Sequence, residues 1–472
     1  MDRFTAWIAE ISNFIWGIPL MIILIGGGLF LTVRLGFFQF RYLPHIIGQT
    51  FGKMFSKSEG QGTLTPFQAT TSALASTMGA ANIVGVPVAI ALGGPGAIFW
   101  MWLVALIGMG TKFSEVVLGM HYREKNQKGE YVGGPMYYIK KGLGWKKVAA
   151  FIALALMIEI VASTMVQSNS IAQTMSGSFG LPPFATGLIV AFIVILVTYG
   201  GIKTIGKVTE KLIPFMVVVY LVSALAVLFV NFKEVPQAFA MIFEYAFRPL
   251  SAAGGFAGAG VAAAIRWGLA RGLYSNEAGM GTAPIAHSAA ITSHPVKQGF
   301  WGVFEVIVDT LVVCTITALV ILTSGVWKTI GPDEASTMVT EAFTPIYGSS
   351  IAGMIVSATL FLFVITTVVV IIFYGEKQAE FLFGTSFSKW MRFVYIVAIM
   401  VGAVGGLQFI WQFLDLLLAL VVIPNVIAVL FLSGKVKELT ADYFANHYPI
   451  EKQAKRKGGN VHVRTASEDG NR

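Results

Sequence analysis

Residues 65–96 read TPFQATTSALASTMGAANIVGVPVAIALGGPG, an apolar run long enough to cross a bilayer but rich in small and hydroxyl side chains. Gly79 weakens a helix by about 1 kcal/mol relative to alanine, and Pro87 removes a backbone donor. Irregular backbone at membrane depth is tolerated only against a cavity or other protein. The run therefore predicts a helix broken beside a binding site, while close packing of an intact helix is the alternative.

A second run, residues 250–284, reads LSAAGGFAGAGVAAAIRWGLARGLYSNEAGMGTAP and carries four glycines within its first eleven residues. A stable helix accommodates that density only by unwinding or by packing very tightly. Two interrupted helices, each opening a set of five spans, are typical of inverted-repeat secondary transporters. Together the two runs favour a transporter.

The rest of the chain has the composition of a membrane protein. Of its 472 residues, 56% are hydrophobic and 12% are charged, with a mean hydropathy of +0.73. Soluble globular proteins carry about 25% charged residues. The apolar runs, such as 188–197, do not alternate as the strands of a β-barrel would. The chain is thus expected to be an all-α integral membrane protein, and its net charge of +9 does not indicate a nucleic-acid partner.

Hydropathy predicts about 11 transmembrane helices, each of about 20 residues. We place them at 16–33, 66–91, 97–120, 148–175, 182–200, 211–231, 250–274, 300–323, 350–374, 391–406 and 408–433. Residues 1–65 then form an extra helix and an interfacial amphipathic segment. The two five-helix repeats occupy 66–231 and 232–434, and 435–472 form a basic tail that we expect to be disordered.

Lysine and arginine residues give the expected orientation. Of the 33, 26 lie in segments 34–65, 121–147, 201–211, 293–298, 375–392 and 434–472. Cytoplasmic loops carry such an excess, so the N-terminus is expected outside and the C-terminus in the cytoplasm of a multi-pass protein of the plasma membrane. The single cysteine, Cys314, lies in an apolar run and excludes a disulfide framework.

Enzyme and channel motifs do not stand out. The sequence has no HExxH, GxSxG or P-loop, so we do not expect an enzyme, a cofactor or an ATP-driven pump. We find no ring of acidic residues and no repeated carbonyl loop of the kind that makes a channel filter. An ion channel remains the more distant alternative, and a proton-coupled amino-acid symporter the nearer one.

Four blocks resemble the alanine or glycine:cation symporter family. They are ALGGPGAIFWMWLVALIGMGTKFSEV (91–116), MVQSNSIA (165–172), ARGLYSNEAGMGTAPIAHSAA (270–290) and FYGEKQAEFLFG (373–384). The resemblance covers most of residues 16–434. It implies a LeuT-like five-plus-five inverted repeat preceded by one extra helix, and Na⁺-coupled symport of a small neutral amino acid into the cell by alternating access.

The resemblance also implies site residues. A sodium site would use the carbonyls of Ala75, Met78 and Phe363 and the hydroxyls of Thr366 and Thr367, which suit a hard cation. Alternatively, both hydroxyls bond back to the preceding turn of their own helix. The substrate-binding residues implied are Thr77, Met78, Gly79, Ala80, Asn82, Gln167, Gly255, Gly258, Gly260 and Ile371. The alternative is that Gln167 ties two helices together, because an unpaired amide in an apolar span is costly.

The chain departs from the family pattern at two places. Gly79-Ala80-Ala81-Asn82 stands where the family has Gly-Thr-Gly-Asn, and Val370-Ile371 stands where it has Gly-Trp. Loss of the indole would enlarge or reshape the pocket. The expected substrates are alanine, glycine or the larger glutamine, and we expect glutamine to compete at least as well as alanine.

Charged residues within spans are functional candidates. Glu305 and Asp309 lie one turn apart, so we expect a cation partner or one protonated carboxyl, serving either proton coupling or a structural hydrogen bond. Arg271 and Glu277 are expected to form an inner gate that closes by ion pairing. Lys112 and Glu115 are expected to pair locally. The oligomeric state is not predicted by any of these features.

Overall fold

The computed structural model describes residues 10–11, 14–248, 260–405 and 408–448. These segments are mainly helical, with one small antiparallel sheet of β1 (Glu124–Lys125) and β2 (Tyr131–Val132). The helices of the first half are α2 (Ile18–Met21), η1 (Ile22–Gly26), α3 (Gly27–Arg34), α4 (Phe38–Arg41), α5 (Leu43–Gln49), η2 (Phe51–Lys53), α6 (Pro66–Thr77), η3 (Ala81–Gly85), α7 (Val86–Gly93), α8 (Ala97–His121), α9 (Pro135–Gly142), α10 (Lys146–Phe179), α11 (Pro183–Tyr199) and α12 (Gly201–Val230).

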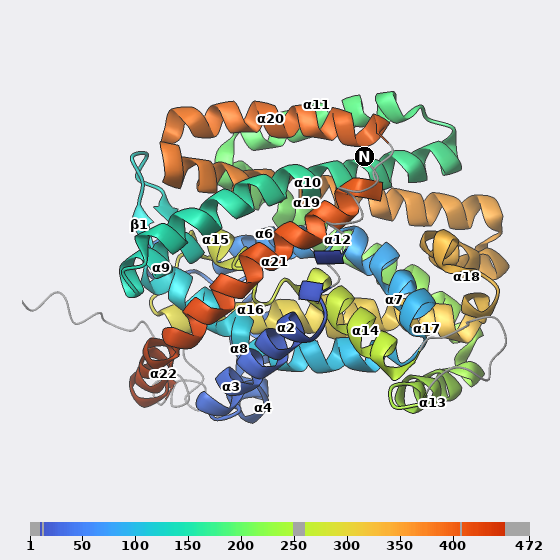
Figure 1. Ribbon diagram of the computed structural model, residues 1–472, viewed down its shortest axis with the longest axis horizontal. Helices are drawn as coiled ribbons and strands as arrows, with labels where there is room; N and C mark the ends of the chain where they lie inside the picture. The colour runs from blue at the N-terminus through green and yellow to red at the C-terminus, as the bar shows by residue number, and fades with distance from the viewer. Residues whose placement is uncertain (1–9, 12–13, 249–259, 406–407, 449–472) are drawn as a thin grey trace, which may run out of the picture.

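The second half continues the same architecture (Figure 1). Its helices are η4 (Phe232–Glu234), α13 (Val235–Tyr245), α14 (Val261–Asn276), α15 (Ala283–His287), α16 (Pro295–Val306), η5 (Ile307–Cys314), α17 (Thr315–Ser324), η6 (Val326–Lys328), η7 (Pro332–Thr337), α18 (Met338–Tyr347), α19 (Ser349–Phe383), α20 (Thr385–Val404), α21 (Gln408–Phe431), α22 (Ser433–Asp442) and η8 (Tyr443–His447).

Among the described residues, seven helices are long and apolar enough to cross a membrane. The pair α6 and η3–α7, bent by 45°, makes an eighth if it is one span. The predicted spans 16–33 and 182–200 correspond to the shorter apolar helices Pro19–Arg34 and Pro183–Tyr199, and 250–274 includes residues outside the described ranges. The mainly helical membrane architecture is confirmed, whereas the count of 11 spans and the two five-helix repeats stay predictions.

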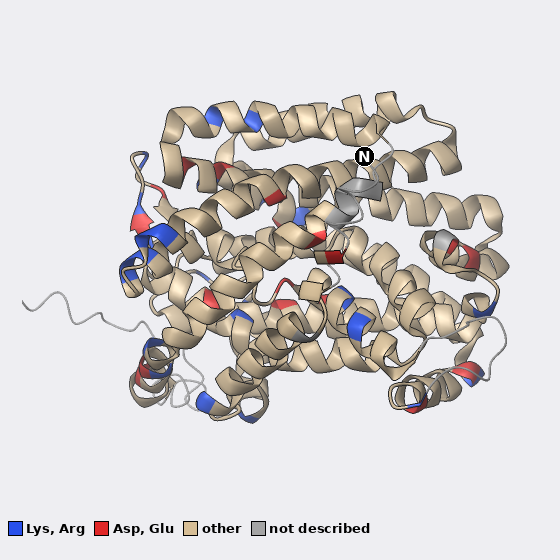
Figure 2. Cartoon of the chain, in the orientation of Figure 1, with Lys and Arg blue, Asp and Glu red and all other residues tan. Residues whose placement is uncertain are grey.

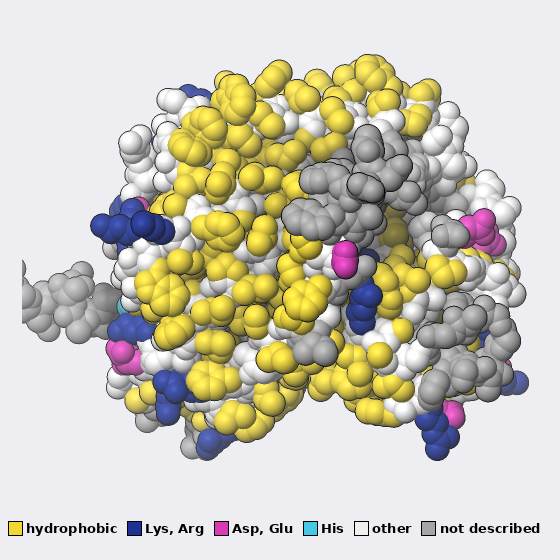
Figure 3. Space-filling view, in the orientation of Figure 1, with side chains coloured by type: hydrophobic (Ala, Val, Ile, Leu, Met, Phe, Trp, Pro, Cys, Tyr) yellow, Lys and Arg dark blue, Asp and Glu magenta, His cyan; other side chains and the backbone are white. Residues whose placement is uncertain are grey.

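The helices differ in how deeply they lie within the bundle. The most apolar part of α8 is 89% buried, but that of α12 is only 28% buried. On the outer helices, Phe192, Phe215, Phe229 and Phe393 are exposed. Hydrophobic side chains cover much of the visible face (Figure 3). In a bilayer these side chains would face lipid, so α8 belongs to the centre of the protein and α12 to its periphery.

The start of α6 is fixed by its own sequence. Thr65 and Gln68 form a capping box, in which each side chain accepts a hydrogen bond from the other residue's backbone N–H at 3.1 Å. Pro66 occupies the first turn, where its missing N–H costs nothing. Along its length α6 packs against α12 and α19, so its far end lies inside the bundle.

The tail differs from its prediction. Residues 435–472 were expected to be disordered, but α22 and η8 continue the helical structure to His447, and residues 449–472 lie outside the described ranges. Tyr443 in η8 is fully buried and accounts for this order, because its ring packs against Phe300 of α16. The aromatic residues of 443–448 supply an apolar face that the later, basic part of the tail lacks.

Candidate functional site

The break after α6 exposes backbone groups in the middle of the protein. α6 ends at Met78, whose backbone leaves the helical conformation (φ −81°, ψ 69°), and the chain resumes as the π-helix η3. The N–H of Gly79 bonds to the carbonyl of Thr77 at 3.0 Å instead of to that of Ala75, four residues earlier. The Ala75 carbonyl therefore loses its ordinary helical partner and is open to another group.

Thr367 of α19 is the hydrogen-bond partner of the Ala75 carbonyl. Its Oγ1 lies 2.8 Å from the Ala75 carbonyl oxygen and 2.9 Å from that of Phe363 in the same helix. One hydroxyl proton serves only one of the two carbonyls at a time. A cluster of uncharged oxygens thus joins the broken helix to α19, of the kind that a hard cation such as Na⁺ prefers.

Thr366 behaves differently from its neighbour. Its Oγ1 bonds back to the carbonyls of Leu362 and Phe363, at 3.0 and 2.9 Å, and also lies 4.0 Å from the sulfur of Met216 in α12. Phe363 therefore links both threonines. Of the five residues expected at the sodium site, the structure joins Ala75, Phe363, Thr366 and Thr367 by hydrogen bonds; Met78 is buried at the break.

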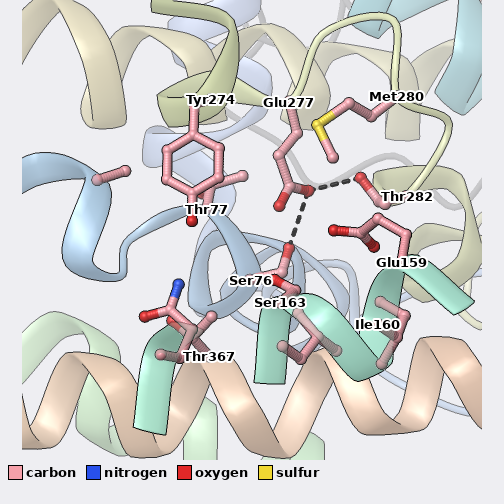
Figure 4. Close-up of a pocket in the computed structure, with 13 residues that line it drawn as sticks. Ser76, Thr77, Glu159, Ile160, Ser163, Tyr274, Glu277, Met280, Thr282 and Thr367 are labelled. Atoms are coloured by element: carbon pink, nitrogen blue, oxygen red, sulfur yellow. Dashed lines mark hydrogen bonds between the residues drawn. The ribbon is translucent and has the colours of Figure 1, made fainter. Parts of the chain in front are cut away.

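A small pocket, with a cavity volume of about 20 Å³, lies beside this cluster (Figure 4). Its walls come from α6, η3, α10, α14, α19 and the segment after α14. The lining residues are Ser76, Thr77, Ala81, Glu159, Ile160, Ser163, Gln167, Tyr274, Glu277, Met280, Thr282, Thr367 and Ile371.

Gln167 meets the expectation of a ligand-binding amide better than that of a structural one. The side chain is buried, and its Oε1 has no hydrogen-bond partner among the described residues. The amide lies against Gly79: a Cβ at position 79 would be 3.2 Å from Nε2 and 2.8 Å from Thr367 Oγ1. Gly79 thus allows the broken helix, Gln167 and Thr367 to approach one another, and the free amide oxygen faces a site that a polar ligand can complete.

The remaining predicted substrate residues divide into three groups. Thr77 and Ile371 line the pocket with Gln167. Three residues, Met78, Gly79 and Ala80, are buried at the break but do not line the pocket. Gly260 directly precedes α14 and is also not among the lining residues. Gly255 and Gly258 lie outside the described residues.

Asn82 lies outside the pocket lining, and its substrate role stays a prediction. Its Nδ2 donates to a carboxylate oxygen of Asp309 at 2.7 Å, and its side chain does not line the pocket. The cause is the π-helix η3, whose wider turn rotates side chains away from the positions that a regular helix gives them. Asn82 joins η3 to η5, where Asp309 also accepts a hydrogen bond from Ser275.

Glu159 and Ser163 are pocket residues that the sequence reasoning missed. They precede Gln167 on α10 by eight and four residues, so all three lie on one face of that helix. A polar side chain at every fourth position of an otherwise apolar span was the available signal. The other missed lining residues are Ser76, Ala81, Ile160, Tyr274, Met280 and Thr282.

The expected gate residues form no ion pair in this structure. Glu277 lines the pocket and accepts hydrogen bonds from Ser76 and Thr282. The Arg271 guanidinium lies 5.3 Å from the ring centre of Trp267 and 6.0 Å from that of Tyr274. A gate made by Arg271 and Glu277 would require another conformation.

The other buried charges are held in structural networks. Lys112 pairs with Glu305 at 3.5 Å and donates to the carbonyl of Asn276, so the expected local pair with Glu115 is wrong. Glu115 instead accepts the N–H groups of Gly279 and Gly281. For Glu305 the expected cation partner is present, and Asp309 has the expected hydrogen bonds to other helices.

Three side chains outside the expected spans lie close enough together to be considered as metal ligands. The ligand atoms of His294, Asp442 and His447 lie within 4.8 Å of one another. Burial lowers the pKa of His294 to about 4, so this ring is neutral at pH 7. Its Nδ1 accepts from the N–H of Val296, which leaves the proton on the Nε2 that faces Asp442. The hydrogen bond between His294 and Asp442 joins the start of α16 to the end of α22.

A broken helix inside an apolar bundle, with a polar pocket at the break, defines a multi-pass membrane transporter. The comparisons with known proteins agree. Residues 1–457 match the sodium:alanine symporter family, and the chain belongs to this family. It is a family of symporters and not of enzymes, so the protein is an amino-acid symporter of the membrane.

Several relatives resemble the chain over nearly its full length. An uncharacterized transporter of Bacillus subtilis, YflA, is 53% identical and matches over 94% of this chain and 95% of its own. The sodium/alanine symporter AgcS of Methanococcus maripaludis is 39% identical, with 92% and 96% covered. A probable sodium/glutamine symporter of Bacillus subtilis, GlnT, is 36% identical, with 94% and 91% covered.

A solved structure shares the fold. The crystal structure of MhsT in complex with L-phenylalanine matches with a TM-score of 0.60 and covers 86% of this chain and 94% of its own. The sequences are only 13% identical, so the likeness concerns the fold alone.

Proposed function

We propose that the protein couples the entry of Na⁺ to the uptake of a small neutral amino acid by alternating access. The observation that carries the proposal is the contact between Thr367 Oγ1 and the Ala75 carbonyl, 2.8 Å apart, across the break in the first pocket helix. A sodium ion bound there would hold α6 and α19 together beside the pocket. By thermodynamic linkage, if the bound ion changes the affinity for the amino acid by some factor, the bound amino acid changes the affinity for the ion by the same factor.

The pocket supports a small neutral amino acid as the substrate. Gln167 offers an unpartnered amide oxygen, and Ile371 offers an apolar wall where the family usually has tryptophan. Alanine and glycine are the smaller candidates, and the relative GlnT, a probable sodium/glutamine symporter, adds glutamine. We expect unlabelled glutamine to reduce the uptake of labelled alanine at least as well as unlabelled alanine does, in vesicles with an inward Na⁺ gradient. Clear preference for alanine would overturn this specificity.

The direction of transport follows from the proposed orientation. Lysine and arginine residues gather at the end of the molecule that carries β1, α9 and α22, and are sparser at the end with α13 and α18 (Figure 2). The positive-inside rule supports a cytoplasmic location for the first end, with the N-terminus outside the plasma membrane.

Proton-coupled symport is the second candidate, and one observation favours it. Two buried carboxylates, Glu159 and Glu277, line the same pocket. Uptake measured with the pH equal on both sides separates the candidates, because a proton-coupled carrier would then gain nothing from a Na⁺ gradient.

A further inference from the structure

One end of the pocket is occupied by two acidic side chains from different helices. Glu159 projects from the middle of α10, and Glu277 follows the last residue of α14. Both are buried, with 3% and 7% of their surface exposed, and both line the pocket. In Figure 4 the Glu159 carboxylate points toward the side of the pocket where Glu277 and Thr282 lie. Carboxylates are costly to bury without a compensating charge.

The Glu277 carboxylate is held in place by neighbouring hydroxyls. Its Oε2 accepts hydrogen bonds from Thr282 Oγ1 at 2.5 Å and from Ser76 Oγ at 3.2 Å. Its backbone adopts a left-handed conformation, φ 54°, at the C-cap of α14, an unusual conformation for a residue with a side chain. Each hydroxyl oxygen keeps lone pairs that can accept a hydrogen bond or bind a cation.

Glu159 and Ser163 have no such partners. No hydrogen bond or ion pair joins the Glu159 carboxylate or the Ser163 hydroxyl to any residue of the ranges that the structure describes. Ser163 is 8% exposed and lies one turn from Glu159, so both polar groups face the pocket from the same side of α10. Glu159 and Ser163 thus supply unpartnered buried oxygens next to the carboxylate of Glu277, which is already positioned. Together these oxygens form a partial coordination shell that a bound ligand would complete.

Neither carboxylate at this end of the pocket forms an ion pair. Within the described parts of the chain, no lysine, arginine or histidine forms a salt bridge with Glu159 or Glu277. Lys112 acts on Glu277 electrostatically, but its ammonium is paired with Glu305 and donates to the Asn276 carbonyl, so its single charge is shared. Two carboxylates that share a buried site cannot both be ionised without a cation.

We infer that Glu159 and Glu277, with the hydroxyls of Ser163, Ser76 and Thr282, form a second Na⁺ site in the pocket. The inference rests on the proposed Na⁺-coupled transport and adds a second ion to it. Carboxylate and hydroxyl oxygens are hard ligands that suit Na⁺. The ion would balance one negative charge, and the ammonium of a zwitterionic amino acid in the same pocket would pair with the other carboxylate.

The two ion sites share the broken helix. Ala75 turns its carbonyl to Thr367 of α19, while the next residue, Ser76, turns its hydroxyl to Glu277. An ion at either site therefore fixes the last turn of α6 against a different partner. Occupation of both sites ties α6 to α19 and to the end of α14 at once, so the two ions bind cooperatively through one element.

The wild-type protein in proteoliposomes provides the first test. Uptake of radioactive sodium and of labelled alanine, measured together with the charge moved and with the pH clamped equal on both sides, gives the coupling ratio. We expect about two Na⁺ and about two charges per alanine, with sigmoidal dependence on Na⁺. One Na⁺ and one charge per alanine would overturn the second site. One Na⁺ and two charges per alanine would show that the site takes a proton and would overturn the assignment to Na⁺.

Variants then locate the site. Glu159→Gln should lower the ratio to about one Na⁺ per alanine, and Glu159→Asp should keep the ratio but require several-fold more Na⁺. Ser170→Ala is the matched control on α10, because the Ser170 hydroxyl bonds back to Val166 within the helix. A ratio of two in Glu159→Gln would overturn the placement. If Glu159→Gln does not fold, an unchanged Na⁺ requirement in Glu159→Asp would do the same. Absence of any Na⁺ dependence in the wild type would instead reject the proposed function itself.

Discussion

At the residue scale, the central feature is a threonine that completes the hydrogen bonding of a helix it does not belong to. Thr367 and Ala75 lie 292 positions apart in the chain, and their contact depends on the break that frees the Ala75 carbonyl. In the proposed mechanism, a sodium ion bound at this point would replace the hydroxyl proton as the partner of the carbonyl.

Thr367→Ala tests that contact. Removal of the hydroxyl should raise the Na⁺ concentration for half-maximal uptake by about tenfold, equivalent to about 1.4 kcal/mol. Thr359→Ala is the matched control, because Thr359 is a buried threonine of the same helix whose Oγ1 bonds only back to the Ile355 carbonyl in the described structure. Equal Na⁺ requirements in the two variants would remove Thr367 from the site.

Gln167→Ala tests substrate recognition. The buried Oε1 of Gln167 is free to accept a hydrogen bond from a ligand, and a lost hydrogen bond to a charged group costs about 1.5–3 kcal/mol. We expect the KM for alanine to rise by at least tenfold while the protein remains folded. Gln173→Ala is the control, since Gln173 bonds to Asn169 within α10. A KM unchanged in Gln167→Ala would favour the helix-tying role.

Sequence reasoning reached some of these residues and missed others for physical reasons. Thr367, Gln167 and Ile371 were predicted because polar or family-marked residues stand out in apolar spans. The place of Asn82 outside the pocket lining was not predictable, because Asn82 lies in a π-helix and nothing in ANIVG marks that change from a regular helix. Glu159 was overlooked because a single carboxylate has no local partner, and only its four-residue spacing from Ser163 and Gln167 reveals the shared face.

At the scale of elements, α14 depends on a close approach to α8. Gly268 of α14 packs where an added Cβ would lie 2.3 Å from the Ala97 carbonyl oxygen and 2.7 Å from Cβ of Trp100. Neither the backbone of α8 nor the first atom of a side chain can move aside easily. Small residues at such crossings let helix backbones approach in membranes, where no hydrophobic force brings them together.

Gly268→Ala should therefore destabilise the protein by about 1–3 kcal/mol through overpacking. The midpoint of thermal unfolding in detergent, followed by tryptophan fluorescence, should fall. Gly177→Ala is the control: position 177 of α10 has no atom within 4 Å of an added Cβ, and alanine favours a helix by up to about 1 kcal/mol. An unchanged or higher midpoint in Gly268→Ala would contradict the tight crossing.

The elements themselves were predictable to different degrees. Gly79 and Pro87 indicated the break between α6 and α7, and the capping residues Thr65 and Gln68 mark where α6 begins. The π-helix η5 was not predictable, because IVDTLVVC reads as an ordinary apolar span. Its wider turn follows from the contacts of Asp309 with η3 and α14, which only the folded protein brings together.

At the scale of the whole molecule, the distribution of charge predicts the orientation in the membrane. The distribution of apolar residues does not predict which side of each helix is buried. The excess of lysine and arginine in alternate segments was readable from the sequence. Which helix faces lipid was not, because a lipid-facing side and a buried side are equally apolar in a bilayer. The burial of α8 and the exposure of α12 therefore emerge only from the structure.

The orientation is testable with single cysteines. The chain has one cysteine, Cys314, which is buried, so a Cys314→Ala background offers no competing thiol. Lys128 and Lys328 are exposed at opposite predicted sides. In intact cells, a membrane-impermeant thiol reagent should label Lys328→Cys but label Lys128→Cys only after the cells are opened. The reverse pattern would invert the proposed topology.

The central claim is that a sodium gradient drives amino-acid uptake through the pocket at the break. The most direct measurement is alanine uptake into proteoliposomes with equal pH on both sides and the membrane potential clamped at zero, with and without an inward Na⁺ gradient. The proposed mechanism predicts transient accumulation above equilibrium with the Na⁺ gradient, and a much higher Na⁺ requirement in Thr367→Ala. Uptake that reaches the same level and rate without Na⁺ would contradict it.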